Sequence, residues 1–215
     1  MSLDSHVHLF VPGAADDPRT LVLLHGTGGD EREFGALGEL LAPGAARLSV
    51  RGNVREHGMN RFFRRLVEAV YDLDDLAVRT AELRRFVDAA LAHHGRDPAE
   101  AIAVGYSNGA NILANLLLVG PSVPPRAVLM HPLIPFEPAP GPDLTGVDVL
   151  ITAGARDPIG PMGLTDRLAA LLRDRGAAVE LRVFPGGHAL TRPEVDTVHD
   201  WLAQAGARGS RMPSS

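Results

Sequence analysis

Short apolar runs alternate with helix-patterned segments from one end of this sequence to the other. The runs that read as strands cover residues 20–24, 47–50, 101–104, 127–130, 147–152 and 179–184, and an opening strand is expected over 6–11. Most are nearly continuous in apolar residues, which is typical of strands buried on both faces of a parallel sheet. The pattern predicts an α/β fold with a mostly parallel central sheet flanked by helices on both faces.

The segments between these runs carry helical spacing. In residues 74–94, apolar side chains recur at i, i+3, i+4, i+7 and i+8, starting from Leu83. Asp72 or Asp74 is expected to cap the start of this helix, and Gly95 its end. The same spacing predicts helices over 108–119 and 165–175, and a last one around Val195, Val198 and Leu202.

Length and composition fit one globular domain. The chain has 215 residues, of which 45% are hydrophobic and 22% charged. We expect a single domain over 1–205 and a small, polar, disordered tail over 206–215. The first residues show no signal peptide, and no run of about 18 apolar residues is present to span a membrane. A cytoplasmic protein is therefore expected.

Two missing residue types exclude several kinds of chemistry. The chain has no cysteine and no lysine. Cysteine nucleophiles, thiolate metal sites, Schiff-base lysines and Walker A phosphate loops are thus impossible. The net charge of −5 argues against nucleic acid as the partner. A small-molecule substrate is expected instead, and a homodimer is left open.

A candidate nucleophile lies between a predicted strand and a predicted helix. Gly105-x-Ser107-x-Gly109 follows the run 101–104 and precedes the helix 108–119. A sharp strand-to-helix turn presents the serine hydroxyl above the sheet, and the small neighbours let the backbone approach closely. The alternative is a tight turn with an incidental serine, which the flanking strand and helix disfavour.

An acid and a base follow in the chain order that this nucleophile turn requires. Asp157 comes just after the run 147–152, and His188 follows the run 179–184 and a glycine pair. His188 would take the Ser107 proton, and Asp157 would orient the imidazole and stabilise its charged form. Among competing acids, Asp148 lies inside a strand, and helix capping explains Asp166.

A glycine-rich loop after the run 20–24 is the candidate oxyanion hole. Its sequence is His25-Gly-Thr-Gly-Gly, in which glycines free the backbone to aim N–H groups at a ligand. Thr27 and Asn108, the residue after the nucleophile, would donate these N–H groups. A dinucleotide-binding loop is the rival interpretation, but the third glycine of that motif is missing.

Together these motifs resemble the small carboxylesterase/phospholipase family of the α/β-hydrolases. The resemblance extends to acyl-protein thioesterases, dienelactone hydrolases and bacterial esterases linked to hydroquinone or quinone resistance. The segments that carry it are 25–31, 51–54 with 61–64, 105–110, 154–157 and 186–188. It implies Ser107, Asp157 and His188 as a catalytic triad, Thr27 and Asn108 as oxyanion donors, and no cofactor. Dienelactone hydrolases usually use cysteine, so Ser107 points away from that activity.

Several further residues are candidates for substrate binding. The segment 53–75 is expected to cover the site, with one of Phe62 and Phe63 lining the pocket. His131 follows a strand and is a minor candidate for substrate contact. It departs from the small pair that the family has at 131–132. A group of arginines could attract an anionic substrate, although a solvated face is favoured: Arg51, Arg61, Arg64 and Arg65.

The predicted function is hydrolysis of carboxylic esters through an acyl-enzyme intermediate. Acyl thioesterase and lysophospholipase activities are alternatives within the same machinery. A catalytically silent small-molecule binding protein on this fold is the non-enzyme alternative. A metal-dependent hydrolase is a further one, because His6 and His8 alternate along a strand as metal ligands would. The further ligands that such a site needs are missing from the pattern, so no metal is predicted.

Overall fold

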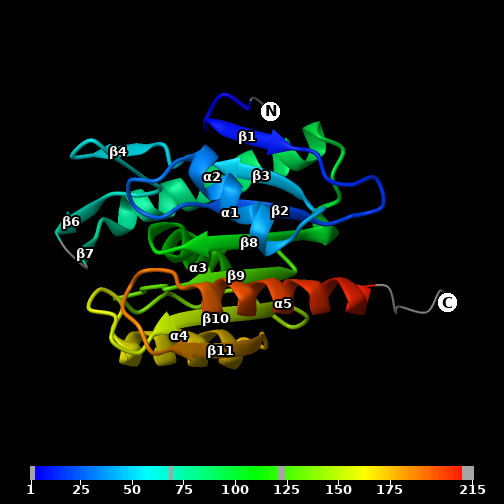
Figure 1. The fold of residues 1–215 in the computed structure, drawn as a ribbon. Helices are drawn as coiled ribbons and strands as arrows, with labels where there is room; N and C mark the ends of the chain where they lie inside the picture. Colours follow the sequence, from blue (N-terminus) through cyan, green and yellow to red (C-terminus); the bar gives the residue numbers. More distant parts are fainter. Residues whose placement is uncertain (1–2, 68–69, 121–123, 210–215) are drawn as a thin grey trace.

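A seven-stranded sheet forms the centre of the computed structural model, which describes residues 3–67, 70–120 and 124–209 (Figure 1). Its strands are β1 (His8–Val11), β2 (Thr20–Leu24), β3 (Ala46–Val50), β8 (Ala101–Tyr106), β9 (Arg126–Met130), β10 (Asp148–Gly154) and β11 (Ala178–Phe184). They lie in the order β1-β3-β2-β8-β9-β10-β11. Only β1 runs antiparallel to its neighbour. The predicted α/β fold with a mostly parallel sheet is confirmed.

Helices cover both faces of the sheet. They are α1 (Glu31–Leu41), α2 (Leu73–His93), α3 (Asn108–Val119), α4 (Met162–Asp174) and α5 (Arg192–Gly209), with a short 3₁₀ turn at Pro98–Glu100. Buried side chains of α2, α3 and α4 form one core with one face, and those of α1 and α5 form a second core with the other. Figure 1 views the sheet from the side of α1 and α5. None of the described helices is both long and apolar enough to cross a membrane.

Strand β11 differs from the expectation of a strand buried on both faces. Its side chains are half-buried or exposed, and Val183 is 47% exposed, whereas every residue of β2 is buried. β11 is the last strand in the order and pairs only with β10. Its place at the edge of the sheet accounts for the difference, and the charged residues Glu180 and Arg182, which alternate with apolar ones, suit that place.

Helix starts follow their capping side chains. The Asp72 carboxylate accepts the Asp75 N–H and caps α2, as predicted, and Gly95 at φ +63° follows its end. Helix α1 was not anticipated from the sequence. Asp30 caps it by accepting two backbone N–H groups, each at 2.9 Å.

Two helix boundaries differ from the prediction. Helix α4 begins at Met162, so Asp166 lies beyond its first turn and the capping role expected for it is wrong. Helix α5 continues through Gly209 and thus covers residues 206–209 of the predicted tail. Residues 210–215, the rest of that tail, lie outside the described residues.

The segment that was expected to cover the site forms two hairpins. The first joins β4 (Val54–Glu56) to β5 (Met59–Arg61), and the second joins β6 (Arg65–Val67) to β7 (Val70–Tyr71). Figure 1 shows both beside the end of the sheet toward which β8 points. Arg61, Arg65 and Tyr71 from these hairpins line a pocket at Ser107, as expected of a segment that covers the site.

Candidate active site

Ser107 lies at a strained turn between β8 and α3. Its φ of +50° and ψ of −114° lie outside the regions that a non-glycine residue usually adopts. The turn is possible because Gly105 and Gly109 have no side chain: a Cβ on Gly109 would overlap the carbonyl oxygen of Leu24 in β2. The Ser107 N–H donates to the Met130 carbonyl at 2.9 Å and ties the turn to β9. The sequence pattern thus forms the sharp strand-to-helix turn that was predicted for the candidate nucleophile.

Asp157 lies in the loop after β10, and hydrogen bonds hold its carboxylate. One oxygen, Oδ1, accepts the N–H groups of Ile159 at 2.8 Å and Gly160 at 3.1 Å. The other, Oδ2, accepts from the imidazoles of His188 at 2.7 Å and His131 at 2.9 Å. Burial raises the pKa of Asp157, but these hydrogen bonds outweigh it, so the pKa lies below its ordinary value.

His188 connects this carboxylate to the serine hydroxyl. Its Nδ1 is 2.7 Å from Asp157 Oδ2, and its Nε2 is 2.8 Å from Ser107 Oγ. A carboxylate only accepts, so Nδ1 carries the proton and Nε2 is free to accept from the hydroxyl. The structure therefore brings the three predicted residues together in the geometry of nucleophile, base and orienting acid. The competitor Asp148 lies at the opposite, amino end of β10.

The glycine-rich loop after β2 is fixed by an imidazole. Gly52 N–H donates to His25 Nε2 at 3.0 Å, so Nδ1 carries the His25 proton and donates to the Gly26 carbonyl at 2.6 Å. Burial lowers the pKa of His25, which keeps the ring neutral for this double role. Thr27, which follows Gly26 in this loop, borders the pocket at Ser107.

Asn108 borders the same pocket from the start of α3. Its backbone N–H belongs to the first turn of the helix, where amides have no partner within the helix and the dipole favours negative charge. Its side-chain Oδ1 accepts the Phe62 N–H at 2.7 Å, which fastens the covering segment to α3. Both predicted oxyanion donors thus lie beside the serine.

A pocket of about 330 Å³ opens beside the serine and the imidazole. Its walls come from the loop after β2, both hairpins and the starts of several loops: Thr27, Arg61, Arg65, Tyr71, Tyr106, Ser107, Asn108, Asn111, Leu133, Ile159 and His188. Arg61 donates to Thr27 Oγ1 at 2.6 Å, and both arginines pair with Glu56. The pocket therefore combines one polar, arginine-bearing wall with apolar side chains such as Leu133 and Ile159.

Four residues predicted to bind substrate are not among the described residues that line this pocket. Arg51 forms a two-point ion pair with Glu31 at 2.6 and 2.8 Å. Phe62 and Phe63 are both buried, against the rings of His25 and Tyr71 respectively. His131 is 3% exposed and lies behind Asp157. Packing thus directs Phe62, Phe63 and His131 into the protein, an ion pair holds the half-buried Arg51, and substrate contact by the four residues stays a prediction.

A buried carboxylate that the sequence did not single out completes the site. Glu194, in the first turn of α5, is fully buried beside His131, at 3.2 Å from its Nε2. Thr152 in β10 donates to Glu194 Oε1 at 2.6 Å. An acidic residue in a first helical turn is ordinary, and its partner lies far away in the sequence. No local signal could have identified it.

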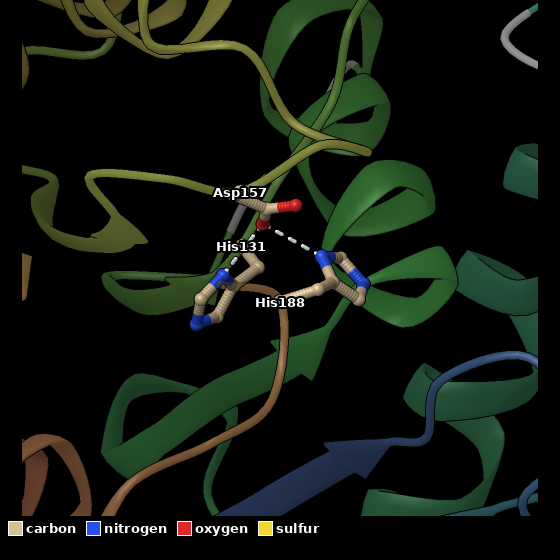
Figure 2. Close-up of side chains that lie close together, drawn as sticks. All are labelled: His131, Asp157 and His188. Atoms are coloured by element: carbon tan, nitrogen blue, oxygen red, sulfur yellow. Dashed lines mark hydrogen bonds and ion pairs between the residues drawn. The ribbon is translucent and has the colours of Figure 1, made fainter. Parts of the chain in front are cut away.

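The histidines near the N-terminus that were considered as alternative metal ligands have other contacts. His6 Nδ1 is 3.1 Å from Ser5 Oγ, His8 Nδ1 is 3.1 Å from the His6 carbonyl, and both rings lie near Phe86. A different group, His131, Asp157 and His188, brings potential ligand atoms within 4.8 Å of one another (Figure 2). Both imidazoles point their Nδ1 at one carboxylate oxygen at hydrogen-bond distance. These two hydrogen bonds to Asp157 account for the clustering of the three side chains, and we assign the cluster to proton transfer rather than to metal binding.

Comparison with known proteins places the chain in a family. Residues 67–209 match the dienelactone hydrolase family. The putative hydrolase MhqD of Bacillus subtilis (strain 168) is 43% identical over 198 residues, which cover 92% of this chain and 98% of that protein.

Solved structures are similar over the same extent. The structure of a Bacillus cereus carboxylesterase superposes with a TM-score of 0.89 at 42% identity, covering 93% of this chain and 94% of that one. A carboxylesterase from Mesorhizobium loti superposes with a TM-score of 0.87 at 31% identity, covering 93% of this chain and 95% of that one. Sequence and fold thus point to the same group of proteins.

Proposed function

Because this chain belongs to the dienelactone hydrolase family, we propose that Ser107, Asp157 and His188 are the catalytic triad of this carboxylesterase-like hydrolase. The observation that carries the proposal is the distance of 2.8 Å between Ser107 Oγ and His188 Nε2. At this distance the imidazole can take the hydroxyl proton as the oxygen attacks. The similar structures named carboxylesterases, from Bacillus cereus and Mesorhizobium loti, support an ester as the substrate.

The reaction has two halves. Ser107 Oγ attacks the ester carbonyl carbon while its proton moves to His188 Nε2, and the carbonyl oxygen becomes an oxyanion. The oxyanion accepts the N–H groups of Thr27 and Asn108, each worth roughly 3 kcal/mol in other hydrolases. His188 then gives its proton to the leaving alcohol oxygen, which leaves an acyl-serine ester. A water molecule, deprotonated by His188, releases the carboxylic acid and restores the Ser107 hydroxyl.

Asp157 has a charge-stabilising role in both halves. Its Oδ2 lies 2.7 Å from His188 Nδ1, so the carboxylate fixes the tautomer that leaves Nε2 free and stabilises the imidazolium that forms. The pKa of Asp157 lies below its ordinary value, because hydrogen bonds outweigh its burial, so the group stays negative at neutral pH. The triad needs this permanent charge.

The substrate is proposed to be a small ester. The pocket of about 330 Å³ at Ser107 is suited to a modest acyl or alcohol group, with Leu133 and Ile159 against its apolar part. Thioesters and lysophospholipids would use the same machinery and stay alternatives. A binding protein without catalytic activity is disfavoured, because binding alone does not require a strained serine within hydrogen-bond distance of an imidazole.

Hydrolysis of p-nitrophenyl acetate by the wild type and by Ser107→Ala tests the proposal. We expect the variant to lose at least about 10³-fold in kcat/KM, because nucleophilic attack is abolished. Thr197→Ala is the matched control, since it removes an exposed hydroxyl on α5 that donates to the Pro193 carbonyl. A fluorophosphonate should label the wild type at Ser107. Equal hydrolysis by wild type and Ser107→Ala would defeat the proposal.

A further inference from the structure

A second imidazole and a second carboxylate lie behind the proposed triad. His131 follows β9 in a left-handed backbone conformation, φ +52°, and is 3% exposed. Figure 2 shows its ring on the other side of Asp157 from His188. Its Nδ1 is 2.9 Å from Asp157 Oδ2, and its Nε2 is 3.2 Å from the Glu194 carboxylate. The triad acid is therefore shared between two imidazoles, and one of them also contacts Glu194.

Hydrogen-bond accounting sets the charge of this second ring. Asp157 Oδ2 is an acceptor, so His131 Nδ1 must donate to it. Glu194 accepts the Thr152 hydroxyl through Oε1, and its carboxyl group faces His131 Nε2. If both nitrogens donate, the ring is an imidazolium between two carboxylates whose side chains are each 1% exposed. Burial disfavours the charged ring, but the bonds to Glu194 and Asp157 outweigh it and raise the pKa of His131.

We propose that His131 is a buried imidazolium, held in that state by Glu194, and that it is a positioning residue that sets the pH at which His188 stops acting as a base. The inference rests on the proposed triad, because it assigns His131 a role through Asp157 and His188. His131 touches neither Ser107 nor the pocket as described. It acts on the reaction through the shared carboxylate.

The groups around His131 fix the direction of the effect. Those that titrate are Asp157 after β10, Glu194 on α5, His188 after β11 and Tyr106 at the end of β8. The ring centroids of His131 and His188 are 5.2 Å apart. A protonated His188 would therefore place a second positive charge beside the first. Glu194 lies at the far nitrogen of the His131 ring and offsets this repulsion only partly.

Two consequences follow for the catalytic base. The positive charge of His131 opposes a second positive charge on the nearby His188 ring, so we expect activity to persist to lower pH than it would without His131. The bond from His131 also fixes Oδ2, the oxygen that faces His188. Glu194 in turn keeps the proton on His131, and Thr152 keeps Glu194 in place.

His131→Asn separates a charge effect from a packing effect. Asparagine keeps a side-chain N–H near the position of Nδ1 and tolerates positive φ better than most residues. We expect the acid limb of the kcat/KM profile to move upward by on the order of one pH unit, because His188 is then protonated more readily. His131→Asn/Glu194→Gln also removes the buried carboxylate that the single variant leaves unpaired, and we expect a smaller upward shift. Asp196→Asn, an exposed site on α5 that pairs with Arg192, should leave the limb in place.

The protonation state of the ring can be read without activity. Nitrogen-15 NMR of the wild type at pH 7.5 should show both His131 nitrogens protonated, with the signal assigned by its loss in His131→Asn. In Glu194→Gln the ring should lose its second proton at lower pH than in the wild type. This result is independent of Ser107, so it stands or falls separately from the proposed triad.

Two outcomes would overturn the inference. One is a neutral His131 ring in the wild type at pH 7.5. The other is an acid limb that stays in place in both the single and the double variant while kcat falls, since that pattern belongs to a residue that only packs. If His131→Asn does not fold, the position of the acid limb in His131→Asn/Glu194→Gln decides the second outcome.

Discussion

The hydroxyl of Tyr106 donates a hydrogen bond of 2.9 Å to the backbone carbonyl of His188. Tyr106 immediately precedes the proposed nucleophile, and its ring lies over that of His188 with centroids 5.6 Å apart. The residue before Ser107 thus binds the loop that carries His188, the proposed base. Strands β9 and β10 separate β8 from β11 in the sheet, and this bond links the end of β8 to the loop after β11.

Tyr106→Phe tests this fastening of the base. The variant keeps the ring and loses one hydrogen bond, which is worth about 1 kcal/mol. We expect kcat/KM for p-nitrophenyl acetate to fall several-fold, because His188 samples positions farther from Ser107. Fluorophosphonate labelling should slow in proportion, while the urea midpoint changes little. Unchanged labelling together with a lowered midpoint would mean that the bond stabilises the fold but does not position the base.

Gly109→Ala tests the close approach of α3 to β2. A Cβ at Gly109 would overlap backbone atoms of Leu24, which cannot move out of the sheet. We expect a loss of about 1–3 kcal/mol or more in the free energy of unfolding, measured in urea, together with loss of esterase activity. Gly163→Ala in α4 is the matched control, because a Cβ there meets open space. It should stabilise by up to about 1 kcal/mol. Equal effects of the two variants would contradict the assigned packing.

Asp157→Asn tests the acid of the proposed triad. The amide keeps the shape of the side chain but loses the charge that stabilises the His188 imidazolium, and it favours the wrong tautomer. We expect kcat/KM to drop by about 10³- to 10⁴-fold. Asp148→Asn, at the amino end of the same strand, is the matched control and should keep wild-type activity. Comparable losses in both variants would argue against the assignment of Asp157.

The pH dependence of stability follows from two pKa shifts. Burial lowers the pKa of His131, but bonds to Glu194 and Asp157 outweigh it, and the folded-state pKa lies above its usual value. The stabilisation is therefore complete below about pH 6.5 and is lost as the pH rises through the folded pKa. The pKa of Asp157 is lowered in the folded state, so its contribution is present above about pH 3.9 and is lost as the pH falls through the folded pKa.

Urea unfolding from pH 4 to pH 9 measures this dependence. We expect the wild type to lose unfolding free energy as the pH rises above about 6.5, and His131→Asn/Glu194→Gln to lose less over the same interval. On the acid side, both proteins keep Asp157 and should lose stability as the pH falls below about 4, with the smaller loss in the double variant, because His131 supplies one of the bonds that lower the pKa of Asp157. A wild type and double variant with parallel curves on the alkaline side would contradict the raised pKa of His131.

Local patterns in the sequence determined the parts of this protein that depend on neighbouring residues. Continuous apolar runs marked the strands of the central sheet, and the cap at Asp72 marked the start of α2. Ser107, Asp157 and His188 each follow a strand, β8, β10 and β11 respectively, which sufficed to expect them together, because the carboxyl ends of parallel strands meet at one edge of a sheet. Helix α1 has an equally local cap at Asp30, so its start could also have been predicted from the sequence.

Tertiary structure alone decided which side chains face the pocket and which protons are shared. Phe62 and Phe63 are both buried, Arg51 pairs with Glu31, and β11 lies at the sheet edge. Glu194 contacts His131 across 63 positions of the chain, and neither residue carries a local sign of the other. Periodicity and spacing report on backbone conformation, whereas the burial and charge of a side chain depend on partners brought together only by folding. The sequence therefore sufficed to expect Ser107, Asp157 and His188 at one edge of a parallel sheet, whereas the strand order and the carboxylate of Glu194 could not be predicted from it.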